Sequence, residues 1–142
     1  MGTPKKRILA GAVLLLLVGG VYLYSTLDVS HQTVRFRLGT LCASIYEYQR
    51  LTGQWPGSAA DLAGTSMSLQ MQYWQEEIRT GQVVVLWPQN FKPHSKDNAD
   101  RILAYYTGGL ISRFGRQWVC WGDLRTEYLP TAELETALRR EQ

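Results

Sequence analysis

The chain has 142 residues, of which 45% are hydrophobic and 19% are charged, and its formal net charge is +3. This composition is typical of a folded protein and leaves room for one domain and an anchor. Lys5, Lys6 and Arg7 precede the first acidic residue, Asp28, and the other twelve basic residues are matched by twelve acidic ones. The excess positive charge is therefore N-terminal, which removes the electrostatic basis for binding nucleic acid.

Residues 8–27 form an uninterrupted run of twenty uncharged residues. A helix of that length spans roughly 30 Å, the thickness of a hydrocarbon core, and Tyr22 and Tyr24 lie at its far end, where such rings favour the interface. The basic cluster at the near end keeps the N-terminus in the cytoplasm. The sequence therefore predicts a cytoplasmic N-terminus at 1–7, a transmembrane helix at 8–27 and an exported domain at 28–142.

A cleaved signal peptide is the alternative reading of this segment, because it has the same basic start and apolar centre. The run ends in YLYSTL at 22–27, which contains no small-residue cleavage site, and this favours an uncleaved anchor. Four small residues in the run are candidates for contact with a partner helix, although glycine is also common in membrane helices: Gly11, Ala12, Gly19 and Gly20.

After a polar joint at 28–32, apolar residues recur at spacings of four and three and predict an amphipathic helix of about sixteen residues: Val34, Leu38, Leu41, Ile45 and Tyr48. Thr52-Gly53 and Pro56 end this helix, and a short helical turn follows at 58–62 with Ser58 as N-cap. The stretch 67–80 fits neither period and is interpreted as a loop with some extended or helical character.

The remaining segments predict an antiparallel meander followed by a short helix. Strands are expected at 82–87, 101–106, 117–121 and 125–129, with a further short strand at 111–114. Residues 92–100 form a polar loop, and Pro130 opens a last helix at 131–140 with acidic residues first and basic residues last. The predicted class is α+β, with the amphipathic helix packed on a small antiparallel sheet.

Two segments carry a family resemblance: YEYQRLTGQWPGSAADL at 46–62 and GRQWVCWGDLRTEYL at 115–129. Both are similar to hallmarks of type II secretion pseudopilins and related prepilin-like proteins, the first to the end of their long helix and the second to their C-terminal hairpin. The resemblance implies a pilin-like fold in the bacterial inner membrane, with a periplasmic domain. The membrane segment has no acidic residue where prepilins carry a processing-site Glu, which points to a shared fold without the polymer.

Oxygen-bearing residues in the polar loop are weak candidates for calcium ligands, as some pseudopilins bind calcium in this region: Asp97, Asn98 and Asp100. The alternative interpretation is a solvated turn. Cys42 and Cys120 are an even pair in an exported domain, so a disulfide is chemically permitted. Strand alternation opposes it, because Cys120 points away from the helix if Val119 and Trp121 face it, and two free thiols are then expected.

Five tryptophans are many for a chain of this size. Core and turn packing is expected to claim Trp55 and one of Trp118 and Trp121. Trp74 and Trp87 lie beside polar or proline-containing segments and are candidates for contact with a partner or the membrane interface.

Catalytic motifs, phosphate-binding glycine loops and metal-ligand spacings around the two histidines do not occur in the sequence. A non-enzymatic protein without cofactor or small-molecule substrate is therefore expected. The leading hypothesis is a membrane-anchored accessory subunit of a larger membrane complex, of respiratory or photosynthetic type, that binds other integral membrane subunits. The alternatives are a pseudopilin-like component of a type II secretion or type IV pilus system, and a periplasmic domain that binds calcium or another ligand.

Overall fold

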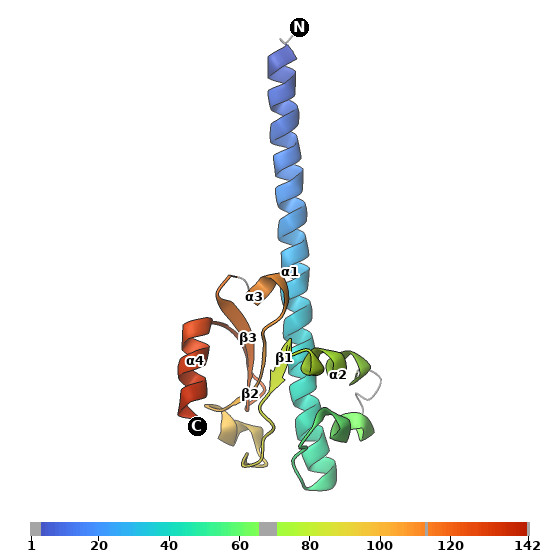
Figure 1. Ribbon diagram of the computed structural model, residues 1–142, viewed down its shortest axis with the longest axis vertical. Coiled ribbons are helices and arrows are strands. Elements are labelled where there is room, and N and C mark those ends of the chain that lie inside the picture. Colours follow the sequence, from blue (N-terminus) through green and yellow to red (C-terminus); the bar gives the residue numbers. More distant parts are fainter. Residues whose placement is uncertain (1–3, 66–70, 113, 142) are drawn as a thin grey trace. The chain divides into compact units, whose positions relative to one another are not determined.

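The computed structural model of the protein describes residues 4–65, 71–112 and 114–141. The chain divides into two compact units, Met1–Gln32 and Thr33–Gln142. The elements, drawn in Figure 1, are α1 (Pro4–Thr52), η1 (Ala59–Gly64), α2 (Met71–Arg79), β1 (Val83–Val85), η3 (Ser95–Asn98), β2 (Ile102–Tyr106), α3 (Gly109–Ser112), β3 (Arg116–Trp121), β4 (Thr126–Pro130) and α4 (Thr131–Arg140). This is the predicted α+β class.

Residues 28–32, the polar joint through which the membrane helix was predicted to continue into the amphipathic helix, are themselves helical and belong to α1. The polar side chains of this region form hydrogen bonds within the helix. The hydroxyl groups of Ser25 and Thr26 donate to the carbonyl of Tyr22, and that of Ser30 donates to the carbonyl of Thr26. Because these hydroxyl groups bond to carbonyls one helical turn earlier, Ser and Thr remain in the helix without disrupting its backbone hydrogen bonds.

The sheet has four strands in the order β1-β2-β3-β4, and every neighbouring pair is antiparallel. This confirms the predicted meander. Both faces of the sheet are covered, α1 lying against one face and α4 against the other (Figure 1).

The core on the first face is formed by the apolar stripe of α1. Leu38, Leu41, Cys42 and Ile45 have at most 1% of their surface exposed. They contact strand residues such as Ala104 and, with them, exclude water from one side of the sheet. Burial of a full Leu or Ile side chain contributes about 2 kcal/mol, so this stripe is the main attachment of the helix to the domain.

The second core lies under α4 and contains Ile102, Val119 and Leu134. The sequence analysis opposed a disulfide on the condition that Val119 and Trp121 face the long helix, and the structure does not meet that condition. Alternate residues of a strand point to opposite faces, and here Val119 and Trp121 pack toward α4 while Cys120 joins the α1 core. Because α4 covers the far face of the sheet, Val119 and Trp121 pack there and not against α1.

Two local predictions also differ from the structure. Residues 71–79, interpreted as part of a loop at 67–80 with some extended or helical character, form the helix α2, and residues 67–70 lie outside the described residues. Trp74 and Ile78 are four residues apart on α2, and both pack into the α1 core. The predicted strand at 111–114 is replaced by the helical turn α3, which begins at Gly109 with φ of +71°. The short helix after Ser58 is confirmed, and Asp61 accepts the backbone N–H of Ser58 at 2.9 Å.

The β3–β4 turn approaches η3 so closely that only glycine fits at position 122. A Cβ atom on Gly122 would lie 2.5 Å from the carbonyl oxygen of Asn98 and 2.9 Å from the ring of Phe91. Contacts this short force the backbone apart. The side chain of Asn98 holds η3 in place through hydrogen bonds with Tyr46 and with the backbone of Lys92.

Gly122→Ala is therefore expected to lower the free energy of unfolding by about 3 kcal/mol. The matched control is Gly39→Ala, whose added Cβ would meet its nearest atom at 3.7 Å and should leave stability unchanged or raise it by up to about 1 kcal/mol. Denaturant unfolding of the full chain in detergent measures both. Equal stability of the two variants would contradict the packing argument.

Candidate functional site

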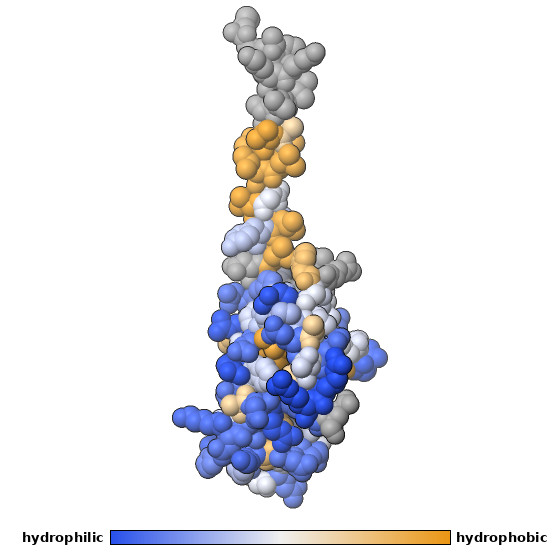
Figure 2. Space-filling model, turned by 90° about the vertical axis from the view of Figure 1, so that its left-hand side faces the viewer, coloured by the Kyte–Doolittle hydropathy of each residue, from blue (hydrophilic) through white to orange (hydrophobic). Residues whose placement is uncertain are grey.

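The N-terminal unit presents an apolar surface on every side of its helix. Between Val13 and Tyr24, the large apolar side chains are 49% to 77% exposed, with the highest value at Leu16. Figure 2 shows this surface as mostly hydrophobic, with paler patches between the hydrophobic residues, whereas the visible face of the domain is mostly hydrophilic. α1 is long and apolar enough near the N-terminus to cross a membrane.

The small residues of this segment leave open space on its surface. A Cβ atom added to Gly11, Gly19 or Gly20 would meet nothing within 4 Å. Ala12 and Gly19 are seven residues apart and share one face of the helix. The described part of the chain therefore does not require small residues at the three glycine positions.

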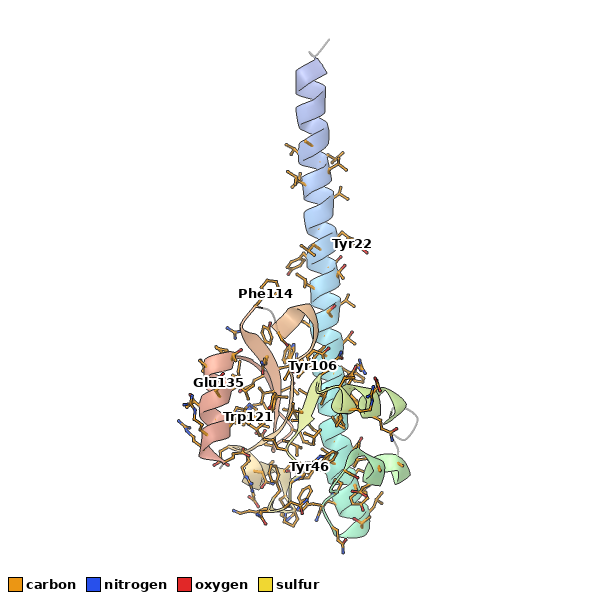
Figure 3. All side chains as sticks on the ribbon, viewed as in Figure 1. Tyr22, Tyr46, Tyr106, Phe114, Trp121 and Glu135 are labelled. Atoms are coloured by element: carbon orange, nitrogen blue, oxygen red, sulfur yellow. The ribbon has the colours of Figure 1, made fainter. Side chains whose placement is uncertain are left out.

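In the domain, a buried polar cluster joins α1, η3 and the β3–β4 turn. The hydroxyl group of Tyr46 donates to the carbonyl of Gly122 and accepts from Asn98 Nδ2 at 2.9 Å. Asn98 is 1% exposed, and its Nδ2 also donates to the carbonyl of Lys92 at 2.8 Å. Figure 3 shows Tyr46 reaching from α1 toward the sheet.

This cluster changes the interpretation of the predicted calcium ligands. Asn98 Oδ1 accepts the backbone N–H of Lys92 at 2.9 Å inside the domain, whereas Asp97 and Asp100 are exposed. The structure therefore does not bring the oxygens of the three predicted residues to a common site. Among the described residues, no group of three or more His, Cys, Asp or Glu side chains gathers as a metal centre requires.

Cys42 and Cys120 are free thiols, and both are fully buried. They belong to the same core cluster, so the geometric objection that Cys120 turns away from the helix was wrong. Burial raises the pKa of the Cys42 thiol well above its ordinary value, and the hydrogen bond with the neighbouring Cys120 thiol adds to the shift. The Cys42 thiol is thus held protonated, and both sulfur atoms are shielded from solvent.

The two tryptophans proposed as contact residues lie inward. Trp74 is 3% exposed and belongs to the α1 core, which corrects its assignment to a surface. Trp87 is half-buried and packs against the same core. Both fill the space beside α1, where bulky aromatic rings bury more area than any other side chain.

In the described part of the unit Thr33–Gln142, the exposed aromatic residues are ones that the sequence analysis did not select. Phe36 is 70% exposed and Phe114 is 67% exposed. Phe36 could have been found from the helix period, because it lies two residues from both Val34 and Leu38 and therefore off the buried stripe. The sequence around Phe114 carries no comparable signal.

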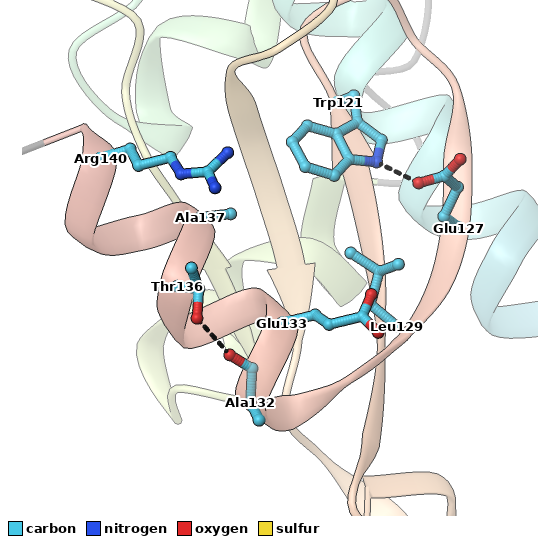
Figure 4. Close-up of a pocket in the computed structure, with 8 residues that line it drawn as sticks. All are labelled: Trp121, Glu127, Leu129, Ala132, Glu133, Thr136, Ala137 and Arg140. Atoms are coloured by element: carbon cyan, nitrogen blue, oxygen red, sulfur yellow. Dashed lines mark hydrogen bonds between the residues drawn. The ribbon is translucent and has the colours of Figure 1, made fainter.

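A groove of about 490 Å³ runs between α4 and strands β3 and β4 (Figure 4). Trp121, Leu129 and Ala137 provide apolar lining, and Glu127 lies at its side. Trp121 Nε1 donates to Glu127 Oε2 at 2.8 Å, and Arg125 Nε lies 3.4 Å from the other oxygen of this carboxylate. Glu127 is thus paired locally, and the groove offers contact surface rather than a poised acid or base.

Comparison of the chain with protein-family models, with curated proteins and with solved structures found no match in any of the three.

The polar cluster predicts a measurable dependence of stability on alkaline pH. Burial is the main cause that raises the pKa of Tyr46, and it outweighs the opposing hydrogen bond from Asn98. Because the unfolded chain titrates near pH 10, the protonated Tyr46 contributes stability that is fully present below about pH 10 and is lost as the pH rises through the folded-state pKa.

Tyr46→Phe is therefore expected to cost about 1.5 kcal/mol at pH 8, because the carbonyl of Gly122 loses its donor. The variant should also lose stability less steeply than the parent chain above pH 10. Denaturant midpoints measured from pH 8 to 11 test both effects, with Tyr48→Phe as the control. Parallel pH profiles for the parent and Tyr46→Phe would refute the assignment.

Proposed function

We propose that the protein is a non-catalytic accessory subunit of a larger membrane complex of respiratory or photosynthetic type. Residues 8–27 anchor it in the bacterial inner membrane with the N-terminus in the cytoplasm, and residues 28–142 form a periplasmic domain that acts through protein–protein contacts. The observation that carries the proposal is the exposure of the large apolar side chains around the whole helix between Val13 and Tyr24. A surface of that size and kind is costly in water and stable in lipid.

The small residues of the anchor support contact with other membrane helices. Helices associate in lipid where small side chains let backbones approach, since lipid already surrounds the apolar side chains. Ala12 and Gly19 provide such a face, and the space at Gly19 is open. The partner is therefore another integral membrane subunit whose helix lies along this face.

A pseudopilin-like component of a type II secretion or type IV pilus system is the second candidate. It is favoured by the packing of a long helix stripe, including Leu38 and Ile45, on a small antiparallel sheet. The absence of an acidic residue from 8–27 favours the accessory subunit instead, because pilin-like assembly by the processed route uses a Glu near the mature N-terminus.

The anchor is tested by placing charge in the apolar segment. Leu15→Arg/Leu16→Arg adds two charges to the segment at about 3 kcal/mol each in a bilayer, so the chain should move from the membrane fraction to the soluble fraction after alkaline extraction. Leu51→Arg, at an exposed leucine of the domain, is the control and should remain in the membrane. A C-terminal tag should be cleaved by protease added to spheroplasts, and protection of the tag would overturn the orientation.

The helix contact is tested by filling the open space at Gly19. Gly19→Leu meets no atom of the chain within 4 Å, so its fold should be unchanged, whereas the added side chain occupies the volume of a closely packed partner helix. Mild-detergent purification with mass spectrometry should recover partner subunits with the parent chain and at least several-fold less with Gly19→Leu. Val18→Leu is the control and should retain them.

The identity of the recovered subunits separates the two candidates. Respiratory or photosynthetic subunits support the accessory role, and secretion or pilus components support the second candidate. Recovery of the chain alone, at one copy, would overturn both.

A further inference from the structure

Two exposed arginines, Arg35 and Arg116, are held on β4, and each lies close in sequence to an exposed phenylalanine. Arg35 Nε donates to Thr126 Oγ1 at 3.3 Å, and the guanidinium of Arg116 donates to the carbonyl of Tyr128, two residues further along β4. Phe36 follows Arg35 on α1, and Phe114 lies two residues before Arg116. Figure 3 shows Phe114 at one end of the domain, with Tyr106 between it and Tyr46. We name Arg35, Phe36, Phe114 and Arg116 the Phe–Arg face.

The chain itself limits the distance between the start of the domain unit and the end of the apolar segment. Thr33, the first residue of the domain unit, follows Leu27 by six residues. Six residues rise about 9 Å as a helix and at most about 20 Å as an extended chain. This limit applies at any angle between the segment and the domain.

The Phe–Arg face combines two unusual surface features. Phe36 and Phe114 are two of the three large hydrophobic residues that are exposed on the described part of the domain, the third being Leu51. The hydrogen bonds that hold Arg35 and Arg116 are made to a hydroxyl and a carbonyl oxygen, which are neutral acceptors. By contrast, Arg37, on another side of α1, forms an ion pair with Glu77 at 2.8 Å.

We propose that the Phe–Arg face lies on the surface of the same bilayer that holds the anchor, an inference that rests on the proposed membrane insertion of residues 8–27. Phe36 and Phe114 enter the boundary between headgroups and acyl chains, and Arg35 and Arg116 contact anionic headgroups. Apolar rings beside cationic side chains are the usual composition of surfaces that bind the membrane interface. Each arginine near an anionic surface contributes about 1 kcal/mol.

This contact holds the domain against the membrane. It thereby restricts which domain surfaces remain open to a partner, because the Phe–Arg face is occupied by lipid.

The depth of a nitroxide label tests the proposal in the full chain. Single cysteines are introduced as Phe114→Cys, as Leu51→Cys on the far part of α1, and as Val18→Cys within the apolar segment. Cys42 and Cys120 are buried, and labelling of the parent chain measures their background. Each protein is reconstituted in phosphatidylcholine vesicles with and without phosphatidylglycerol, and collision rates with oxygen and with a water-soluble nickel complex are compared.

The ratio of oxygen to nickel collisions is expected to be highest at position 18, several-fold above the aqueous value at position 114, and aqueous at position 51. Arg116→Gln should lower the ratio at position 114 in vesicles that contain phosphatidylglycerol, whereas Arg50→Gln, at an exposed arginine of the far part of α1, should not.

An aqueous ratio at position 114 with a deep label at position 18 would overturn the surface contact and leave the anchor intact. An aqueous ratio at position 18 would overturn the anchor. An immobilised label at position 114 without oxygen preference would indicate a protein contact there and would overturn the lipid assignment. An equal ratio in the two lipid compositions would overturn the role of the arginines.

Discussion

One helix, α1, has to satisfy two different surroundings, and the rest of the structure depends on how its side chains do so. Between Val13 and Tyr24 the apolar side chains are exposed all around the helix, whereas from Leu38 to Ile45 they are buried on one side only. The backbone accepts both because helical hydrogen bonds are local to the segment. Only the side chains distinguish the part suited to lipid from the part suited to a protein core.

The apolar stripe on one side of α1 has to be buried against an apolar surface formed by the rest of the chain. The sheet supplies it with alternate residues of its strands, including Ala104 and Cys120. Other residues of the same strands, including Ile102 and Val119, point to the far face of the sheet, where another element has to shield them from water. α4 provides that cover through Leu134, which is 2% exposed. The layers of the domain therefore follow from burying both faces of one small sheet.

The polar cluster around Asn98 links the second half of the domain to α1. A buried amide is stable only when its donors and acceptors are paired, and here Tyr46 and the backbone of Lys92 pair them. The same pairing uses the oxygen that the sequence offered to calcium. The surfaces left for function are consequently the apolar segment, the Phe–Arg face and the groove beside α4, each suited to contact with lipid or protein.

The sequence by itself determined the features that depend on composition and period. It identified the apolar run, the stripe of α1, the meander and the bounds of the last helix, because apolar spacing, glycine and proline act locally. It also selected the N-cap at Ser58. Most of the sheet could be predicted from the sequence. The candidate site could be predicted only in part: the sequence analysis named Gly19, which has open space around it, but it did not name the exposed Phe114.

Tertiary structure decided which helix each strand's side chains face, which residues α2 buries and which polar atoms form hydrogen bonds. Strand alternation predicts that a strand has two faces, but it does not say which face meets which helix. Only the position of α4 shows that Cys120 faces α1 and that Trp121 faces α4. Trp74 and Asn98 were assigned to the surface because their neighbours in sequence are polar. Their burial depends on contacts with residues distant along the chain, which local pattern does not encode.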